Sequence, residues 1–221
     1  MKKYKYLVLD FGKVIVSPTT GDWDMTPKFY ELIDVSKIDL EKFNLIRKKY
    51  SSFLSEKLIT REEEYDMFIR FYDSILRELN LPNYNKEIAK LIAHDRTYNH
   101  TKYTLYDCIY DELDQLKKKY ILLLLTDNWP CVNNYLKDFK LDHYFNKVYI
   151  SSIYQEIKKD KRFFDFPIKD FNIKKGEALF IDDTEINLDA AKEKGFDVLL
   201  MDREKVVSKS KNKIIHNLSN L

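Results

Sequence analysis

The chain has 221 residues, of which 44% are hydrophobic and 33% are charged, and its formal net charge is only +2. This composition is typical of a soluble globular protein with one large domain or two small ones. The near cancellation of charge excludes the strong electrostatic field of a nucleic-acid or membrane-binding surface. The apolar runs are too short to cross a bilayer or to form a signal peptide, so we expect a cytoplasmic protein with neither nucleic acid nor membrane as a partner.

The N-terminal part of the chain combines one short apolar run with a long helix-rich stretch. Residues 6–9 predict a buried strand, whereas residues 17–100 have helical patterns and contain no strand-like run. Within that stretch Asp39 is a good N-cap, and Thr60 with Glu63 forms a capping-box pattern. We therefore predict a helical cap domain over residues 17–100, inserted into a core domain that comprises residues 1–16 and 101–221.

The C-terminal half alternates strand and helix patterns. Further continuous apolar runs predict strands at residues 121–125, 147–150, 178–181 and 198–201, and helical patterns occupy residues 106–119, 133–140 and 188–194. Gly195 is a suitable C-cap for the last of these helices, and Pro167 is expected to break or kink a helical region. This alternation indicates βαβ units and an α/β fold with a Rossmann-like open parallel sheet.

Polar residues follow three of the predicted strands. Asp10 ends the first strand, Thr126 follows the second, and Asp182 and Asp183 follow the strand at residues 178–181. Because ligands of open α/β sheets bind beyond the carboxyl ends of the strands, these side chains would converge if the strands are neighbours. Clustered carboxylates repel one another, and Mg²⁺ resolves that repulsion because it prefers oxygen ligands.

Four segments in order resemble the motifs of the haloacid dehalogenase-like (HAD) hydrolase superfamily. They are "LDFGKV", "LLTDN", "SSIYQEIKKD" and "LFIDDTEIN". The chain is most similar to the helical-cap phosphatase branch, which includes glucose-1-phosphatase-like proteins and the N-terminal phosphatase domains of epoxide hydrolases. The resemblance implies a HAD-like core with a helical cap, and a magnesium-dependent phosphatase that acts on a small phosphorylated metabolite.

The same resemblance implies roles for individual residues. Asp10 would be the nucleophile and a metal ligand, Thr126 would bind a phosphoryl oxygen, and Lys158 would neutralise the phosphate. Lys159 is the alternative for this lysine, because Lys158-Lys159-Asp160-Lys161 replaces the usual Lys-Pro-Asp-Pro. The expected Mg²⁺ ligands are Asp10, the backbone carbonyl of Gly12, Asp182 and Asp183. Asn187 matches a polar position that often closes the last motif, and Asp127 replaces the usual Asn.

Gly12 stands where most phosphatases of this family carry a second aspartate that acts as general acid and base. A glycine keeps the carbonyl for Mg²⁺ but lacks the acid/base group, which typically contributes 10²–10⁴-fold to the rate. Asp22 and Asp24 are more simply helix caps or loop residues than a replacement. Two alternatives therefore stay open beside the phosphatase. One is a catalytically weak phosphate-binding or interaction protein that retains the fold, and the other is a metal-independent haloacid dehalogenase, which needs no leaving-group acid.

Overall fold

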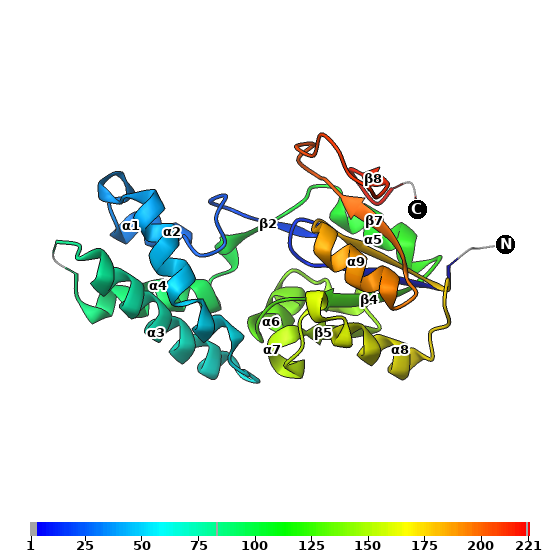
Figure 1. Cartoon of the computed structure of the whole chain (residues 1–221), viewed down its shortest axis with the longest axis horizontal. Coiled ribbons are helices and arrows are strands. Elements are labelled where there is room, and N and C mark those ends of the chain that lie inside the picture. The colour runs from blue at the N-terminus through cyan, green and yellow to red at the C-terminus, as the bar shows by residue number, and fades with distance from the viewer. Residues whose placement is uncertain (1–3, 83, 220) are drawn as a thin grey trace. The chain divides into compact units, whose positions relative to one another are not determined.

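The computed structural model describes residues 4–82, 84–219 and 221, and the chain forms two compact units (Figure 1). The first unit contains the residues up to Ser17, Leu105–Asn128 and Val132–Leu221. The second contains Pro18–Thr104 together with Trp129–Cys131. The second unit thus contains the helices of the insertion together with three residues from the loop that follows Asn128.

A six-stranded parallel sheet forms the centre of the first unit, with the order β5-β4-β1-β6-β7-β8. Its strands are β1 (Tyr6–Leu9), β4 (Ile121–Thr126), β5 (Lys147–Ile150), β6 (Ala178–Asp182), β7 (Asp197–Met201) and β8 (Ile214–Ile215). The predicted fold class is therefore confirmed, including all five predicted strands. The two-residue β8 was not predicted because so short a run has no readable periodicity.

Both faces of this sheet are buried, which explains why its strands have continuous rather than alternating apolar patterns. Every residue of β1 is buried. Tyr6 and Val8 pack in a core with Leu188 of helix α9 (Glu185–Glu193). The other helices of this unit are α5 (Ile109–Lys117), α6 (Cys131–Asp138), α7 (Ser151–Tyr154) and α8 (Asp165–Phe171). Gly195, just beyond α9, has a φ of +90°, as its predicted capping role requires.

The segment between β5 and β6 is broken, although not where Pro167 predicted. Two 3-10 turns, η5 (Lys158–Asp160) and η6 (Arg162–Phe164), meet at Lys161, whose φ is +63°. Pro167 lies in the first turn of α8. A proline is tolerated there because the backbone N–H groups of a first turn have no intrahelical acceptor. The prediction of a break at Pro167 was therefore wrong, and the break lies at Lys161.

The second unit is a helical bundle around an aromatic core. Its helices are α1 (Pro27–Leu32), α2 (Leu40–Lys49), α3 (Arg61–Leu79) and α4 (Lys86–Tyr98). Phe29, Phe43 and Tyr72 are among its buried residues. The predicted caps are confirmed, because Asp39 accepts from the backbone of α2, and Thr60 and Glu63 form a capping box at the start of α3.

A separate two-stranded sheet pairs β2 (Val16–Pro18) with β3 (Tyr103–Leu105). Three short 3-10 turns complete the helical bundle: η1 (Val35–Lys37), η2 (Ser51–Ser55) and η3 (His100–Lys102). Another, η4 (Asp142–Tyr144), precedes β5 in the first unit. Across the described residues, every helix is either too short or too polar to span a membrane.

Candidate active site

Three acidic side chains meet at the carboxyl edge of the sheet. β1 lies between β4 and β6, so the residues that end these strands become neighbours. The backbone N–H of Asp10 donates to Ile181 O at 3.0 Å, which continues the β1–β6 pairing to the end of both strands. One carboxylate oxygen from each of Asp10, Asp182 and Asp183 lies within 4.8 Å of the others. The convergence expected from the strand ends is therefore present.

Lys158 joins two of these carboxylates. Its Nζ lies 2.8 Å from Oδ1 of Asp10 and 2.6 Å from Oδ2 of Asp182, and its side chain is only 2% exposed. The following residue, Lys159, is exposed. Of the two lysines considered from the sequence, Lys158 is therefore the one in the cluster.

Asp127 supports the segment that carries Lys158. Its Oδ1 accepts from the backbone N–H of Lys158 at 3.1 Å. A carboxylate at this position therefore binds protein backbone. The loop of Asp127 is itself held by Ser151, whose Oγ accepts from the N–H of Asn128 at 3.0 Å. The sequence analysis missed Ser151, and the only signal for it was a serine directly after an apolar strand.

Asp182 and Asp183 differ in how many partners they have. Asp182 is fully buried, and it accepts from Thr184 N at 2.8 Å and from Asn187 Nδ2 at 3.1 and 3.2 Å, in addition to Lys158. Asp183 is more exposed, and its Oδ1 accepts from Thr184 Oγ1 at 3.2 Å. Asp182 is thus suited to orient Lys158, while Asp183 keeps more of its carboxylate available to a ligand.

The electrostatics of the cluster follow from its excess of acidic groups. Burial raises the pKa of Asp10, Lys158 opposes that rise, and the carboxylates of Asp182 and Asp183 add to it. Burial and Asp182 likewise raise the pKa of Asp183. Burial would lower the pKa of Lys158, but its acidic neighbours raise it well above the ordinary value. Three carboxylates facing one ammonium leave a net negative charge.

This donor set fits Mg²⁺. The cation prefers oxygen ligands, and it keeps several waters while binding one or two carboxylates. Asp10 and Asp183 supply carboxylate oxygens beside the buried Asp182. The net negative charge of the buried cluster gives a divalent cation an electrostatic reason to bind there.

Gly12 lies in the Asp10 loop, which we define as residues 11–16. Within this loop Phe11 O accepts from Ile15 N at 2.9 Å and from Val16 N at 3.1 Å, and Lys13 N donates to Val16 O at 2.7 Å. Lys13 has a φ of +57°, which is uncommon for a residue with a side chain. The loop is therefore a tight turn of defined backbone geometry directly after Asp10.

The remaining candidates, and the aromatic residue Trp129 near Thr126 in the sequence, have identifiable surroundings. Thr126 is buried at the end of β4. Trp129 packs its ring edge-on against Phe68, with the centroids 5.3 Å apart. Asp22 and Asp24 both pair with Nη1 of Arg47 inside the helical unit, at 2.9 and 3.3 Å. Arg47 is thus the partner of both acidic residues that were weighed as replacements for the missing acid.

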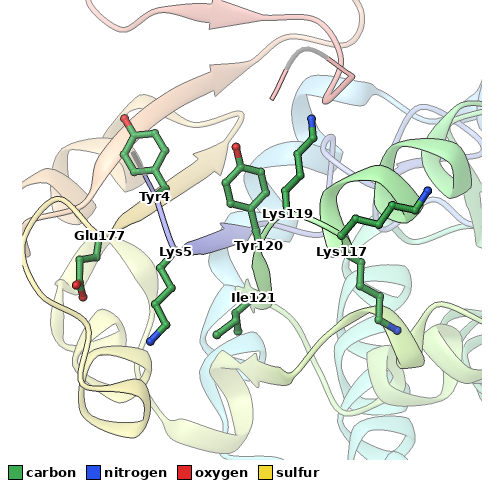
Figure 2. Close-up of a pocket in the computed structure, with 8 residues that line it drawn as sticks. Tyr4, Lys5, Lys117, Lys119, Tyr120, Ile121 and Glu177 are labelled. Atoms are coloured by element: carbon green, nitrogen blue, oxygen red, sulfur yellow. The ribbon is translucent and has the colours of Figure 1, made fainter. Parts of the chain in front are cut away.

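A hollow of about 520 Å³ lies at the opposite edge of the sheet. Its lining includes Lys5, Ile121 and Glu177, which stand at or just before the starts of β1, β4 and β6 (Figure 2). Because these strands are parallel, their starts and their carboxyl ends lie at opposite edges of the sheet. The side chains of Lys5 and Lys119 point in different directions in Figure 2. The hollow therefore lacks the convergence of polar groups that marks the acidic cluster.

Comparisons with known proteins agree with this geometry. The family model described as haloacid dehalogenase-like hydrolase matches residues 31–201. A D-ribitol-5-phosphate phosphatase from Bacteroides thetaiotaomicron is 27% identical over 208 residues, which cover 87% of this chain and 89% of that protein.

Two solved structures show the breadth of similar folds. A HAD family enzyme from B. thetaiotaomicron, in complex with magnesium and inorganic phosphate, has a TM-score of 0.61 and 21% identity, with 93% of this chain and 98% of that chain covered. An L-2-haloacid dehalogenase from Xanthobacter autotrophicus has a TM-score of 0.68 and 12% identity, with coverages of 98% and 96%. Together with the family model, which spans most of the sequence, the fold and the acidic cluster lead to one conclusion: the chain belongs to the haloacid dehalogenase-like hydrolase family.

Proposed function

We propose that this protein is a magnesium-dependent phosphatase that transfers the phosphoryl group of a small sugar or sugar-alcohol phosphate to Asp10 and then to water. The observation that carries the proposal is the cluster of Asp10, Asp182, Asp183 and Lys158 at the carboxyl edge of the sheet. The similarity to a D-ribitol-5-phosphate phosphatase supports the substrate class.

In the first step a carboxylate oxygen of Asp10 attacks phosphorus, and the bond from phosphorus to the substrate oxygen breaks. The products are an aspartyl-phosphate and an alkoxide that must take up a proton. Lys158 neutralises negative charge beside the nucleophile, and the Thr126 hydroxyl donates to a phosphoryl oxygen. Asp182 holds the Lys158 ammonium in place. In the second step water attacks the phosphorus, so that phosphate leaves and the Asp10 carboxylate is restored.

Bound Mg²⁺, held by Asp10, Asp183 and the Gly12 carbonyl, would offset the charge between a carboxylate nucleophile and an anionic phosphate. The same argument separates this proposal from a haloacid dehalogenase. A haloacid also carries a carboxylate, and without a cation the net negative cluster would repel it. A metal-independent reaction is therefore the less favourable use of these residues.

Gly12 leads to a specific expectation about the leaving group of the substrate. With no side chain at that position, protonation of the leaving oxygen must depend on another group or on water. We therefore expect a strong preference for substrates whose leaving group needs no proton, such as p-nitrophenyl phosphate. General acid catalysis typically contributes 10²–10⁴-fold to the rate. We expect p-nitrophenyl phosphate to be hydrolysed faster than alkyl phosphates of similar affinity by a factor in this range.

The test is a hydrolysis assay with p-nitrophenyl phosphate, D-ribitol 5-phosphate and a panel of sugar phosphates, in Mg²⁺ and in EDTA. We expect Mg²⁺-dependent turnover that Asp10→Asn reduces at least 10³-fold, because the amide is a poor nucleophile. Asp142→Asn, an exposed aspartate of the same unit, is the matched control. An acid-quenched reaction should contain phosphate on the Asp10 peptide.

Two results would contradict the proposal. Turnover that is equal in Asp10→Asn and the wild type would exclude Asp10 as the nucleophile. Mg²⁺-dependent phosphate binding without turnover of any substrate would instead identify a binding protein that retains the fold.

A further inference from the structure

The carbonyl of Val14, in the middle of the Asp10 loop, is held by an arginine that is distant in the sequence. Arg203 follows β7, and its Nε and Nη2 donate to Val14 O at 3.1 and 2.9 Å. The Arg203 side chain is only 4% exposed. A buried backbone carbonyl needs a hydrogen-bond partner, and here the partner is a charged group, whose hydrogen bonds are roughly twice as strong as neutral ones.

Glu112 of α5 fixes the guanidinium of Arg203. Nη2 donates to Glu112 Oε2 at 2.7 Å and Nη1 donates to Oε1 at 3.1 Å, which is the bidentate arrangement that a guanidinium matches. Burial would raise the pKa of Glu112, but Arg203 and the N–H of Leu218 hold it below the ordinary value. The pair is therefore charged, buried and geometrically determined.

Two further contacts hold the same loop. The Arg203 guanidinium lies over the ring of Tyr106, 4.9 Å from its centroid, and the backbone N–H of Tyr106 donates to Ile15 O at 3.3 Å. The residue after Arg203 is Glu204, which forms an ion pair with Lys13. Residues 203 and 204 together thus hold residues 13 and 14.

The loop has a reason to need this support. Lys13 lies in the left-handed region of backbone conformation, at a φ of +57°, directly after Gly12. Glycine adopts this region readily, whereas a residue with a side chain does not, so the local sequence alone does not favour the conformation of Lys13. Strained backbone of this kind persists only where the surroundings over-determine it. Gly12, whose carbonyl is the proposed metal ligand, stands two residues before Val14.

We propose that Arg203, oriented by Glu112, is a positioning residue that fixes the Asp10 loop and thereby the Gly12 carbonyl, the proposed metal ligand. Arg203 does not touch the reacting atoms. Its two bonds to Val14 act on the loop, whereas its two bonds to Glu112 connect α5 with the segment after β7. The inference rests on the proposed roles of Asp10 and Gly12.

The two sets of bonds can be separated by substitution. Arg203→Lys keeps a positive charge beside Glu112 but cannot make both pairs of hydrogen bonds. Glu112→Gln keeps the Arg203 bonds to Val14 and weakens the pair. Arg162→Lys is the matched control, because Arg162 is an exposed arginine of the same unit. Leu113→Ala, which removes a buried side chain of α5, serves as a control for lost stability alone.

The primary measurement is amide hydrogen exchange of the full-length protein without metal, which does not depend on turnover. In Arg203→Lys we expect the amides of Ile15 and Val16 to exchange at least tenfold faster, with no change in β4 and β6. Calorimetry with Mg²⁺ should show affinity about tenfold weaker than in the wild type, and kcat should fall by a similar factor. In Glu112→Gln we expect Mg²⁺ affinity and kcat within about threefold of the wild type.

The inference would be overturned if Arg203→Lys left loop exchange and Mg²⁺ affinity unchanged. It would equally fail if exchange rose throughout the sheet, or if affinity fell only in proportion to melting temperature, as in Leu113→Ala. A wild-type protein that binds Mg²⁺ but hydrolyses no substrate would contradict the proposed function and leave the loop measurements intact.

Discussion

Both units of this protein bury charged side chains, but with opposite balance. The α/β unit gathers Asp10, Asp182 and Asp183 around the single ammonium of Lys158. The helical unit buries the carboxylate of Glu64 in a cluster with two cations, Arg96 and Lys102, and it also buries Asp95, which accepts from Lys28 N at 2.9 Å. The first cluster has an excess of negative charge and the second an excess of positive charge.

Aromatic rings and a backbone carbonyl meet part of the charge in the helical cluster. The guanidinium of Arg96 lies 4.8 Å from the centroid of Phe68 and 5.1 Å from that of Trp129, so aromatic faces meet its charge. Lys102 Nζ donates to Arg96 O and lies 3.6 Å from Cys131 Sγ, and burial lowers the pKa of Lys102 to about 8. Cation–π contacts therefore offset part of the charge in this cluster, and the lowered pKa makes the proton of Lys102 easier to lose.

The α/β cluster has no comparable compensation. The pKa values of Asp10 and Asp183 are raised, and the hydrogen bonds that the cluster makes are concentrated on Asp182. Excess negative charge made of oxygen ligands is relieved by a hard cation, whereas excess positive charge among aromatic rings needs no ligand. The difference indicates why one buried cluster is a candidate active site and the other has a structural role.

The largest expected effect comes from removal of the only ammonium in the acidic cluster. In EDTA at pH 8, Lys158→Met should lower the free energy of unfolding by about 3–5 kcal/mol, because it leaves buried carboxylates without a counter-charge. Urea denaturation measures this change, and Lys159→Met should behave as the wild type. Equal stability of the two variants would show that Lys158 does not offset the acidic charges.

A smaller effect is expected at Asp183, whose carboxylate has fewer hydrogen-bond partners than that of Asp182. Asp183→Asn should weaken Mg²⁺ binding by about 10–100-fold, equivalent to about 1.4–2.8 kcal/mol, since it removes a charged ligand. It should also raise the melting temperature in EDTA, because repulsion in the cluster falls. Calorimetry and thermal melts are the measurements, with Asp189→Asn, a partly exposed aspartate of α9, as the control. Unchanged Mg²⁺ affinity would exclude Asp183 as a ligand.

The charge imbalance also predicts a pH dependence of stability. Because the pKa of Asp10 is raised on folding, the folded protein binds more protons than the unfolded chain above pH 4. Stability without metal should therefore fall as the pH rises from 5 to 8, by at least about 1 kcal/mol more than in Asp10→Asn. Urea denaturation in EDTA at several pH values tests this, and saturating Mg²⁺ should flatten the curve. If stability fell more steeply with pH in Asp10→Asn than in the wild type, the pKa of Asp10 would be lowered on folding and the assigned direction would be wrong.

The parts of this molecule that could be predicted from sequence are those set by local patterns. Continuous apolar runs located β1, β4, β5, β6 and β7, because strands buried on both faces leave a strong signal. The caps at Asp39 and Thr60 were predictable because side chain and backbone are adjacent in the sequence. The ordered motifs likewise identified the strand-end carboxylates that converge in the structure.

The parts that escaped prediction depend on contacts between distant segments. Arg203 and Val14 are 189 residues apart, and nothing local to either residue indicates the hydrogen bonds between them. The role of Asp127 toward the Lys158 backbone depends on how two loops pack, and so does the position of the break at Lys161. Glu64 in the middle of an amphipathic helix was indistinguishable from its exposed neighbours until its partner Cys131 was known.

The smallest expected effect tests whether the helical cluster is only structural. Glu64 Oε2 accepts from the backbone N–H of Cys131 at 2.8 Å, within the helical unit, and Cys131 is five residues beyond Thr126 in the sequence. Glu64→Gln retains an acceptor for this bond but removes the charge that partly offsets Lys102 and Arg96. We expect a loss of about 1 kcal/mol in unfolding free energy, which is the usual difference between a hydrogen bond to a charged acceptor and one to a neutral acceptor. Mg²⁺ affinity should stay within about twofold of the wild type, because the compensation in the helical cluster is internal. Calorimetry could instead show that Glu64→Gln weakens Mg²⁺ binding as much as Asp183→Asn does. The two clusters would then be coupled through the chain between Thr126 and Cys131. Their separation into a ligand-binding cluster and a structural cluster would be wrong.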